Sequence, residues 1–349
     1  MNSTSSAPDL DPWSFTRMYI NGEYVSSSSS NTFTVRNPKD NSVVADGIPI
    51  ANSDDVDLAV EHAEEAFRGP WSKFTASQRM QCLHRLAGLL EDQLIPILTL
   101  DSKTSGNPVS IIPTREKNYM VNCILYYSGW TDKQKGDYFP TDDGFVKLVR
   151  HEPLGVCAAI NPFNAPIATF FFKAAPCLAT GNVLIVKPSE KTPLGSLALG
   201  PLFKKAGFPP GVLQILPGDG STGALLAQHM RVHKISFTGS INTGKLIQQA
   251  AAQSNLKRVT LELGGKSPAI IFEDADLDNA LKWTINAILA RSGQVCVAAT
   301  RVYVQKSISE DFIHRYLEMM KAATDDLGDP QDPSVKLGPL VDQGQLERV

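Results

Sequence analysis

From residue 154 onward, short apolar segments alternate with longer segments patterned as helices, and this alternation most constrains the fold. The apolar segments are LGVCAAI, VLIVKP, GVLQILPG, KISFTG and RVTLEL. Between them lie a segment ending at Gly181 and the segments TPLGSLALGPLFKKAG, GALLAQHM and TGKLIQQAAAQ. Strands that are buried on both faces have continuous apolar sequences, and strand–helix alternation is typical of a parallel sheet covered by helices. We therefore predict an α/β fold with a Rossmann-like parallel sheet.

A second, shorter α/β set follows the first. Its expected elements are the strand PAIIF, the helix DLDNALKWTINAILA, the strand RVYVQ and the amphipathic helix SEDFIHRYLEMMKAA. We place the seam between the two sets near residues 263–266. The predicted units are therefore 1–130 with 153–263, and a partial α/β unit over 264–349.

The first 152 residues contain several local signals. Asn-Gly in MYINGEYV indicates a hairpin turn, and residues 131–152 are polar and turn-rich, which predicts a projecting hairpin. We expect a helix with Ser53 as its N-cap, and a second that opens with a capping box between Thr75 and Gln78.

Composition excludes several classes of protein. The chain has 349 residues and a net charge of −3, without a polybasic run, which argues against nucleic acid as a partner. No apolar run of about 18 residues occurs, and the first residues are polar, so we expect neither a membrane span nor a secretory signal. The five cysteines are scattered without a CxxC pair, and the six histidines form neither HxH nor HExxH. This pattern favours reduced thiols in a cytoplasmic protein without a metal site.

Three segments, two of them glycine-bearing, fall at strand ends, where a dinucleotide binds in such folds. One is G-x-G-x-x-G over residues 218–223, which includes Gly220; a phosphate cradle and a plain turn remain equally open there, because no acidic residue follows at the usual distance. Another is FTGSINTG, with Gly239, Ser240 and Gly244. In KPSE, Glu190 beside Lys187 is suited to bind both ribose hydroxyls and to repel a 2′-phosphate, which favours NAD over NADP; a solvated charge pair is the alternative.

Three further residues have side chains suited to catalysis. Glu262 lies between two leucines, which would desolvate a general base; the alternative is a surface glutamate on an edge strand. Asn164 in NPFNAP carries an NH2 group able to stabilise an oxyanion, or is simply a turn residue before a helix. Cys296 in SGQVCVAAT is either a buried apolar filler or a nucleophile.

Taken together, these segments resemble the NAD(P)-dependent aldehyde dehydrogenase superfamily, in its non-acylating, cytosolic and mitochondrial-like class. The matching segments are RHEPLGVC, NPFNAP, ATGNVLIVKPSEKTPL, FTGS, LELGGKSPAIIFEDADLD and GQVCVAATRVYV, and weaker similarity covers essentially the whole chain. The resemblance implies that Cys296 is the nucleophile, Glu262 the general base and Asn164 an oxyanion donor. It further implies a cofactor cleft formed by Ile160, Pro162, Lys187, Glu190, Gly220, Gly239, Ser240, Gly244 and Leu263.

The implied activity is oxidation of a small-molecule aldehyde to a carboxylic acid with NAD, through a thiohemiacetal and a thioester on Cys296. The family relation implies a homodimer or homotetramer, in which residues 131–152 form an oligomerisation hairpin. Family members continue well over a hundred residues beyond the equivalent of Val349, so the resemblance also implies a C-terminally truncated catalytic unit. This leaves an alternative: a non-catalytic NAD-binding relative or a partner of a longer relative.

Overall fold

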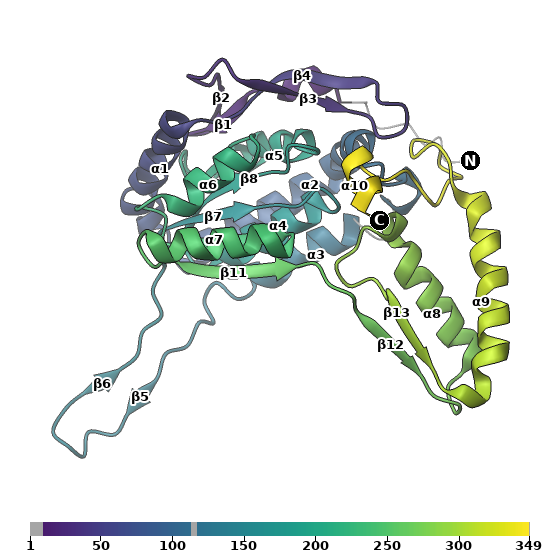
Figure 1. The fold of residues 1–349 in the computed structure, drawn as a ribbon. Helices are drawn as coiled ribbons and strands as arrows, with labels where there is room; N and C mark the ends of the chain where they lie inside the picture. Colours follow the sequence, from purple (N-terminus) through teal and green to yellow (C-terminus); the bar gives the residue numbers. More distant parts are fainter. Residues whose placement is uncertain (1–9, 113–116, 349) are drawn as a thin grey trace, which may run out of the picture.

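The computed structural model describes residues 10–112 and 117–348, and its largest element is a seven-stranded sheet (Figure 1). The strand order is β11-β10-β7-β8-β9-β1-β2. Neighbours from β11 to β9 run parallel, and β1 and β2 add an antiparallel hairpin beside β9. The bounds are β1 Met18–Ile20, β2 Glu23–Val25, β7 Val156–Ile160, β8 Val183–Lys187, β9 Leu213–Ile215, β10 Lys234–Gly239 and β11 Arg258–Leu263. The predicted α/β fold with a parallel sheet is confirmed.

Helices cover both faces of this sheet. Their bounds are α1 Ser53–Arg68, α2 Ala76–Ser105, α3 Lys117–Ser128, α4 Pro166–Ala179, α5 Leu194–Lys205, α6 Gly220–Gln228 and α7 Ile241–Gln253. Helices α2 to α5 contact one another on one face, and α1, α6 and α7 form the layer on the other (Figure 1). Every residue of β7, β8 and β9 is buried, as expected for strands enclosed by two helical layers. No helix within 10–112 and 117–348 is long and apolar enough to cross a bilayer.

The predicted N-terminal cap is confirmed for α2 and is wrong for α1. Thr75 caps α2 in the predicted capping box with Gln78. The Ser53 prediction is wrong, because Ser53 is already the first helical residue of α1. Asn52 is the N-cap: its Oδ1 accepts from the Asp55 N–H, and the Asp55 carboxylate accepts from the Asn52 N–H, so the two residues satisfy each other.

The Asn-Gly hairpin turn between β1 and β2 is also as predicted. Asn21 and Gly22 have φ angles of 52° and 82°, the left-handed pair that a tight two-residue hairpin needs. A separate antiparallel pair, β3 Thr32–Arg36 with β4 Val43–Pro49, packs beside this hairpin region.

The second α/β set lies to one side of the large sheet (Figure 1). Strands β12 Pro268–Ile271 and β13 Arg301–Val304 form a parallel pair, accompanied by α8 Leu277–Leu289 and α9 Ser309–Ala323. Its buried core is small and is separate from the main core; it consists of Ile271, Leu281 and Phe312. The described chain ends in α10, Gln343–Arg348.

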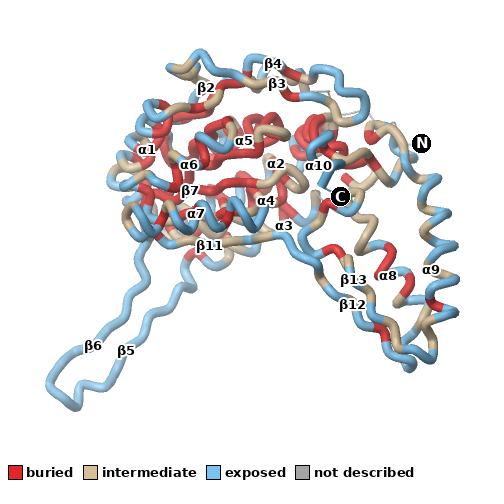
Figure 2. The backbone as a smooth tube through the Cα atoms, viewed as in Figure 1, coloured by how far each residue is buried: buried red, intermediate tan, exposed pale blue. Residues whose placement is uncertain are grey.

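Residues 131–152 form a hairpin that projects away from the body, with β5 Tyr138–Phe139 paired to β6 Lys147–Leu148 (Figure 1). Figure 2 shows almost all of the hairpin as exposed. Several of its exposed side chains are large and apolar, namely Tyr138, Phe139, Phe145, Val146 and Leu148. The predicted role of this hairpin in oligomerisation stays a prediction.

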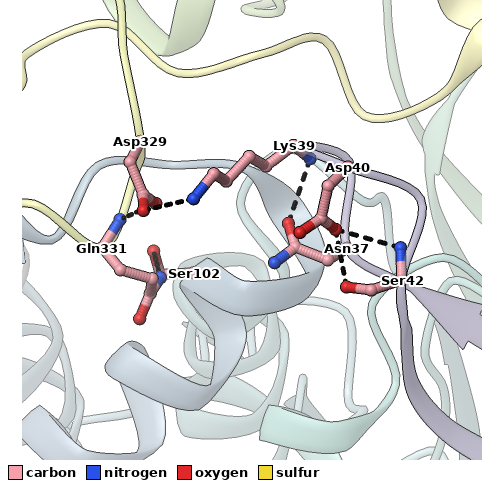
Figure 3. A network of polar contacts seen from close by, with 7 residues as sticks. All are labelled: Asn37, Lys39, Asp40, Ser42, Ser102, Asp329 and Gln331. Atoms are coloured by element: carbon pink, nitrogen blue, oxygen red, sulfur yellow. Dashed lines mark hydrogen bonds and ion pairs between the residues drawn. The ribbon is translucent and has the colours of Figure 1, made fainter.

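The segment before α10 returns to the main body and binds there through polar contacts (Figure 3). Asp329 forms an ion pair with Lys39 at 2.6 Å, and the Gln331 side chain donates to the Ser102 hydroxyl near the end of α2 at 2.7 Å. The Ser102 hydroxyl in turn donates to the Asn107 carbonyl at 2.5 Å. These contacts join the C-terminal part of the chain to the turn that follows α2.

Candidate functional site

The parallel strands bring the predicted residues to one edge of the sheet, the carboxyl edge. Ile160 is paired in register with Lys187 on one side and with Phe237 on the other, and Gly239 is paired with Leu263. Because all these strands run in the same direction, the residues that follow them emerge at the same edge. Ile160 and Phe237 are thus neighbours there, although 77 positions separate them in the sequence.

Lys187 and Glu190 lie together at the end of β8. The Lys187 Nζ lies 3.4 Å from Glu190 Oε2 and donates to the Pro188 carbonyl at 3.0 Å. Burial lowers the pKa of Lys187, and the Glu190 carboxylate opposes this shift. A Cβ on Gly223 would lie 3.5 Å from the Ile160 side chain and 3.9 Å from that of Lys187, so the glycine-bearing turn packs directly against them.

Two helices begin at this edge after glycine-bearing turns. Asp219 caps α6, and Gly220 is its first residue, with open space where a side chain would be. Ser240 caps α7 by accepting from the Thr243 N–H at 3.1 Å, while its hydroxyl also pairs with the Thr243 hydroxyl. A Cβ on Gly244 would lie 2.8 Å from Leu263, so α7 packs closely on β11 at this point. Helix N-termini in this position are suited to bind an anion.

Asn164 occupies the turn between β7 and α4 and is held by several partners. Its side-chain Nδ2 donates to the Gln294 carbonyl at 2.7 Å, 130 positions away in the sequence. Its own carbonyl accepts from Asn107 Nδ2 at 3.1 Å and from the Arg291 guanidinium at 2.7 Å. The structure therefore brings Asn164 to the segment that carries Cys296.

Cys296 follows an unusual turn in which Arg291, Ser292 and Gly293 all have positive φ angles of 50°, 56° and 79°. Of the five cysteines, Cys296 is the exposed one. The alternative of a buried apolar filler is therefore wrong, and the thiol is accessible for reaction. Its side chain forms no hydrogen bond or ion pair with residues 10–112 or 117–348.

The expected desolvation of Glu262 is wrong. Glu262 lies on β11 at the edge of the sheet, where exposed and half-buried residues alternate, and its side chain is exposed. Its leucine neighbours in sequence point to the opposite face of the strand, because successive side chains alternate. They pack towards α7 and therefore leave the carboxylate in contact with solvent.

Lys173, on α4, is a further polar residue at this site that was not predicted from the sequence. Its Nζ donates to the carbonyls of Ile160 and Ser236, at 3.0 and 3.1 Å, where β7 and β10 lie side by side. Burial lowers the pKa of Lys173 to about 7, partly offset by the negative charge of Glu262. A single cation within the apolar segment IATFFFKAAPCLA was the available signal.

Two neighbouring side chains at the same edge have polar atoms without partners. Both side-chain polar atoms of Asn161 and the hydroxyl of Thr238 are buried and make no hydrogen bond within the described part of the chain. Asn161 directly follows Ile160 of β7, and Thr238 directly follows Phe237 of β10. Ile160 and Phe237 are paired in register, so Asn161 and Thr238 lie next to each other. Unpaired buried polar groups are rare, so this edge has hydrogen-bonding capacity left for water or a ligand.

No cluster of three or more metal-binding side chains is found among residues 10–112 and 117–348.

Comparison with known proteins then decides the family. The aldehyde dehydrogenase family model matches residues 24–349. The chain belongs to the aldehyde dehydrogenase family.

Relatives of this aldehyde dehydrogenase are similar over nearly its whole length. Aldehyde dehydrogenase 1A1 of Ovis aries is 41% identical over 99% of this chain and 70% of its own length. Retinal dehydrogenase 2 of Homo sapiens is 42% identical over 99% of this chain and 66% of its own length. The solved NAD+ complex of aldehyde dehydrogenase from Bacillus cereus is 38% identical, with a TM-score of 0.92, over 96% of this chain and 69% of that chain.

In this aldehyde dehydrogenase the three candidate catalytic residues come from separate segments. Asn164 precedes α4, Glu262 is the second-last residue of β11, and Cys296 precedes β13. The structure joins Asn164 to the Cys296 segment through Gln294, and joins Lys187 to Glu190. The negative charge of Glu262 acts on Lys173 of α4.

Proposed function

We propose that this chain oxidises an aldehyde to a carboxylic acid with NAD, using Cys296 as the nucleophile. The observation that carries the proposal is the Asn164 amide, fixed at 2.7 Å on the Gln294 carbonyl, two residues before the exposed thiol. A hydrogen-bond donor beside an accessible nucleophile is the arrangement that acyl chemistry at a carbonyl carbon requires.

The residues at the carboxyl edge fit a dinucleotide. Glu190 and Lys187 would hold the adenosine ribose hydroxyls, and the N-termini of α6 and α7, with Gly220, Gly239, Ser240 and Gly244, would hold the pyrophosphate. The unpartnered buried amide of Asn161 supplies further hydrogen-bonding capacity near Ile160, Pro162 and Leu263. A carboxylate at Glu190 would repel a 2′-phosphate, which supports NAD over NADP.

In the first half-reaction the Cys296 thiolate attacks the aldehyde carbon. The C–S bond forms as the carbonyl π electrons move to oxygen, and the Asn164 amide and the Cys296 backbone N–H donate to that oxygen. NAD held at the carboxyl edge would supply the acceptor for the hydride that leaves this carbon. The carbonyl then re-forms as a thioester on Cys296.

In the second half-reaction water attacks the thioester carbon. Glu262 accepts a proton from that water, the C–S bond breaks, and the carboxylic acid leaves as the thiolate is restored. The exposure of Glu262 allows it to contact solvent water directly. Burial lowers the pKa of Lys173 to about 7, and the negative charge of Glu262 partly offsets this shift.

The decisive experiment replaces the nucleophile. Cys296→Ser is expected to abolish NADH formation with aldehydes while NAD still raises the melting temperature. Cys123→Ser, at a half-buried cysteine, is the matched control and should retain turnover. Turnover that persists in Cys296→Ser would reject the mechanism.

A second candidate function is that of a non-catalytic NAD-binding partner of a longer relative. The observation that favours it is the apolar surface of the second α/β set, which includes a pocket of about 410 Å³ between β13 and α9, lined by Val302, Phe312 and Tyr316 among others. Exposed apolar surface of this kind typically binds protein. Co-purification with a longer homologue, without turnover by the chain alone, would support this candidate, and robust turnover would exclude it.

We further propose the arrangement 1–130 with 153–263 as the NAD-binding unit, 264–349 as the catalytic unit, and 131–152 as an oligomerisation hairpin in a cytoplasmic homodimer or homotetramer. The exposed apolar side chains of the hairpin support this role. Phe145→Asp with Leu148→Asp should lower the mass measured by sedimentation, whereas Val43→Asp, on β4, should not. An unchanged mass in the double variant would reject the hairpin's role.

A further inference from the structure

Asn164, Gln294 and Arg291 form a closed ring of hydrogen bonds beside the candidate nucleophile. The Asn164 Nδ2 donates to the Gln294 carbonyl at 2.7 Å. The backbone N–H and the side-chain Nε2 of Gln294 donate to the Arg291 carbonyl at 3.1 and 3.2 Å. The Arg291 guanidinium donates back to the Asn164 carbonyl at 2.7 Å. Each residue is donor and acceptor at once, so a shift of one changes the geometry of the other two.

The ring contains a backbone that is unfavourable by itself. Arg291 and Ser292 have φ/ψ angles of 50°/37° and 56°/39°, in the left-handed region that residues other than glycine avoid. Such conformations persist where the surroundings hold them, and they concentrate at functional sites. Here the Ser292 hydroxyl donates to the Gly338 carbonyl at 2.6 Å, and Gln294 Oε1 accepts from the Val341 N–H at 3.1 Å.

The hydrogen bond from the Arg291 guanidinium to the Asn164 carbonyl joins the cysteine segment to the turn after β7. A charged donor makes a stronger hydrogen bond than a neutral one, and the planar guanidinium is rigid. The Asn164 carbonyl also accepts a hydrogen bond from Asn107 Nδ2 at 3.1 Å. Asn107 is itself held by Ser102, which binds Gln331. Asn164 is therefore fixed between the end of α2 and the cysteine segment.

We propose that Arg291 is a positioning residue: through the Asn164 carbonyl it keeps the Asn164 amide on Gln294 and so orients the peptide that leads to Cys296. The inference rests on the proposed function for the role of Cys296. One Asn164 Nδ2 proton is used by the Gln294 carbonyl, and the other is left for the oxygen of a bound aldehyde. Arg291 thereby prepares the oxyanion donor without touching the substrate.

Two variants test the guanidinium. Arg291→Gly removes the guanidinium, and glycine adopts the left-handed conformation freely, so a loss of function cannot be attributed to added strain. Arg291→Lys keeps the charge and one donor but loses the planar fork. Arg315→Gln is the matched control, since this arginine forms an exposed pair with Asp278 on the second α/β set.

The test measures two rates in the full chain: alkylation of Cys296 by iodoacetamide, followed by mass spectrometry, and kcat for aldehyde oxidation. Arg291→Gly is expected to lower kcat by roughly tenfold, as for a small misplacement of reacting groups, with the melting shift caused by NAD unchanged. Alkylation is expected to slow by about threefold or more, with partial recovery in Arg291→Lys.

A double-mutant cycle with Asn164→Ala shows whether Arg291 acts through Asn164. The effect of Arg291→Gly should largely disappear when Asn164 is already alanine. Equal effects in both backgrounds, or rates within about twofold of wild type in Arg291→Gly, would overturn the proposal. Because alkylation needs no aldehyde, absence of turnover in the wild-type chain would count against the proposed function while leaving this cycle interpretable.

Discussion

The side-chain amide of Asn164 donates to the backbone carbonyl of Gln294 across 2.7 Å, and this bond joins the turn after β7 to the segment of Cys296. Asn164 lies in the large α/β set and Gln294 in the segment that leads into β13. The bond is partly buried, so water competes with it weakly. This hydrogen bond therefore fixes the position of the Asn164 amide, the oxyanion donor in the proposed reaction.

Asn164→Ala should therefore lower kcat for aldehyde oxidation by about 10²- to 10³-fold, the usual cost of losing an oxyanion donor. Loss of the bond to Gln294 should also lower the free energy of unfolding by about 1 kcal/mol. Steady-state kinetics and urea unfolding measure the two effects. Asn255→Ala, which removes bonds to the carbonyls of Met230 and Val232, is the control and should leave kcat unchanged. Equal kcat losses in both variants would contradict a catalytic role.

Lys173 should make the stability of the protein depend on pH. Its pKa falls from 10.5 in the unfolded chain to about 7 in the folded one. Between these values the unfolded state binds one more proton, so the free energy of unfolding rises with pH, by up to about 1.4 kcal/mol per pH unit. Lys173→Met removes this slope between pH 7 and 9, as measured by urea unfolding at each pH.

The exposed Lys282 supplies the control for this measurement. Lys282→Met should keep the wild-type slope, because it removes an exposed lysine and leaves the buried Lys173 in place. If Lys173→Met also kept the slope, the lowered pKa of Lys173 would be refuted.

Glu190 should set the preference for NAD. Glu190→Gln removes the charge that would repel a 2′-phosphate, and also weakens the bonds that the ribose hydroxyls donate. The NAD-induced rise in melting temperature should shrink, and the NADP-induced rise should grow. Glu273→Gln, at an exposed carboxylate that bonds Ser307, is the control. A selectivity that does not change in Glu190→Gln would place the ribose elsewhere.

The N-cap of α1 can be tested by two alanine variants. Asn52→Ala removes the capping box with Asp55 and should lower the free energy of unfolding by about 1 kcal/mol. Ser53→Ala, within the first turn, should change it by a few tenths of a kcal/mol at most. Chemical denaturation of both proteins provides the comparison, and a larger loss in Ser53→Ala would reverse the assignment of the cap.

Local patterns in the sequence predicted those features that neighbouring residues determine. The parallel strands follow from continuous apolar segments, the β1–β2 turn from Asn21-Gly22, and the start of α2 from Thr75 and Gln78. The α1 cap was misplaced by one residue, because Asn52 and Ser53 are both good caps, and the backbone conformation of the folded chain decides between them.

Residue types and short-range spacing were enough to predict the α/β architecture, the family and the candidate nucleophile. The exposure of Glu262, the lowering of the Lys173 pKa to about 7 and the ring of Asn164, Arg291 and Gln294 became visible in the folded chain alone. Solvent exposure and hydrogen bonding depend on which distant segments meet, and Asn164 is separated from its two partners by 127 and 130 positions. Neither the solvent exposure nor the hydrogen-bond partners of a residue can be derived from its neighbours in the sequence.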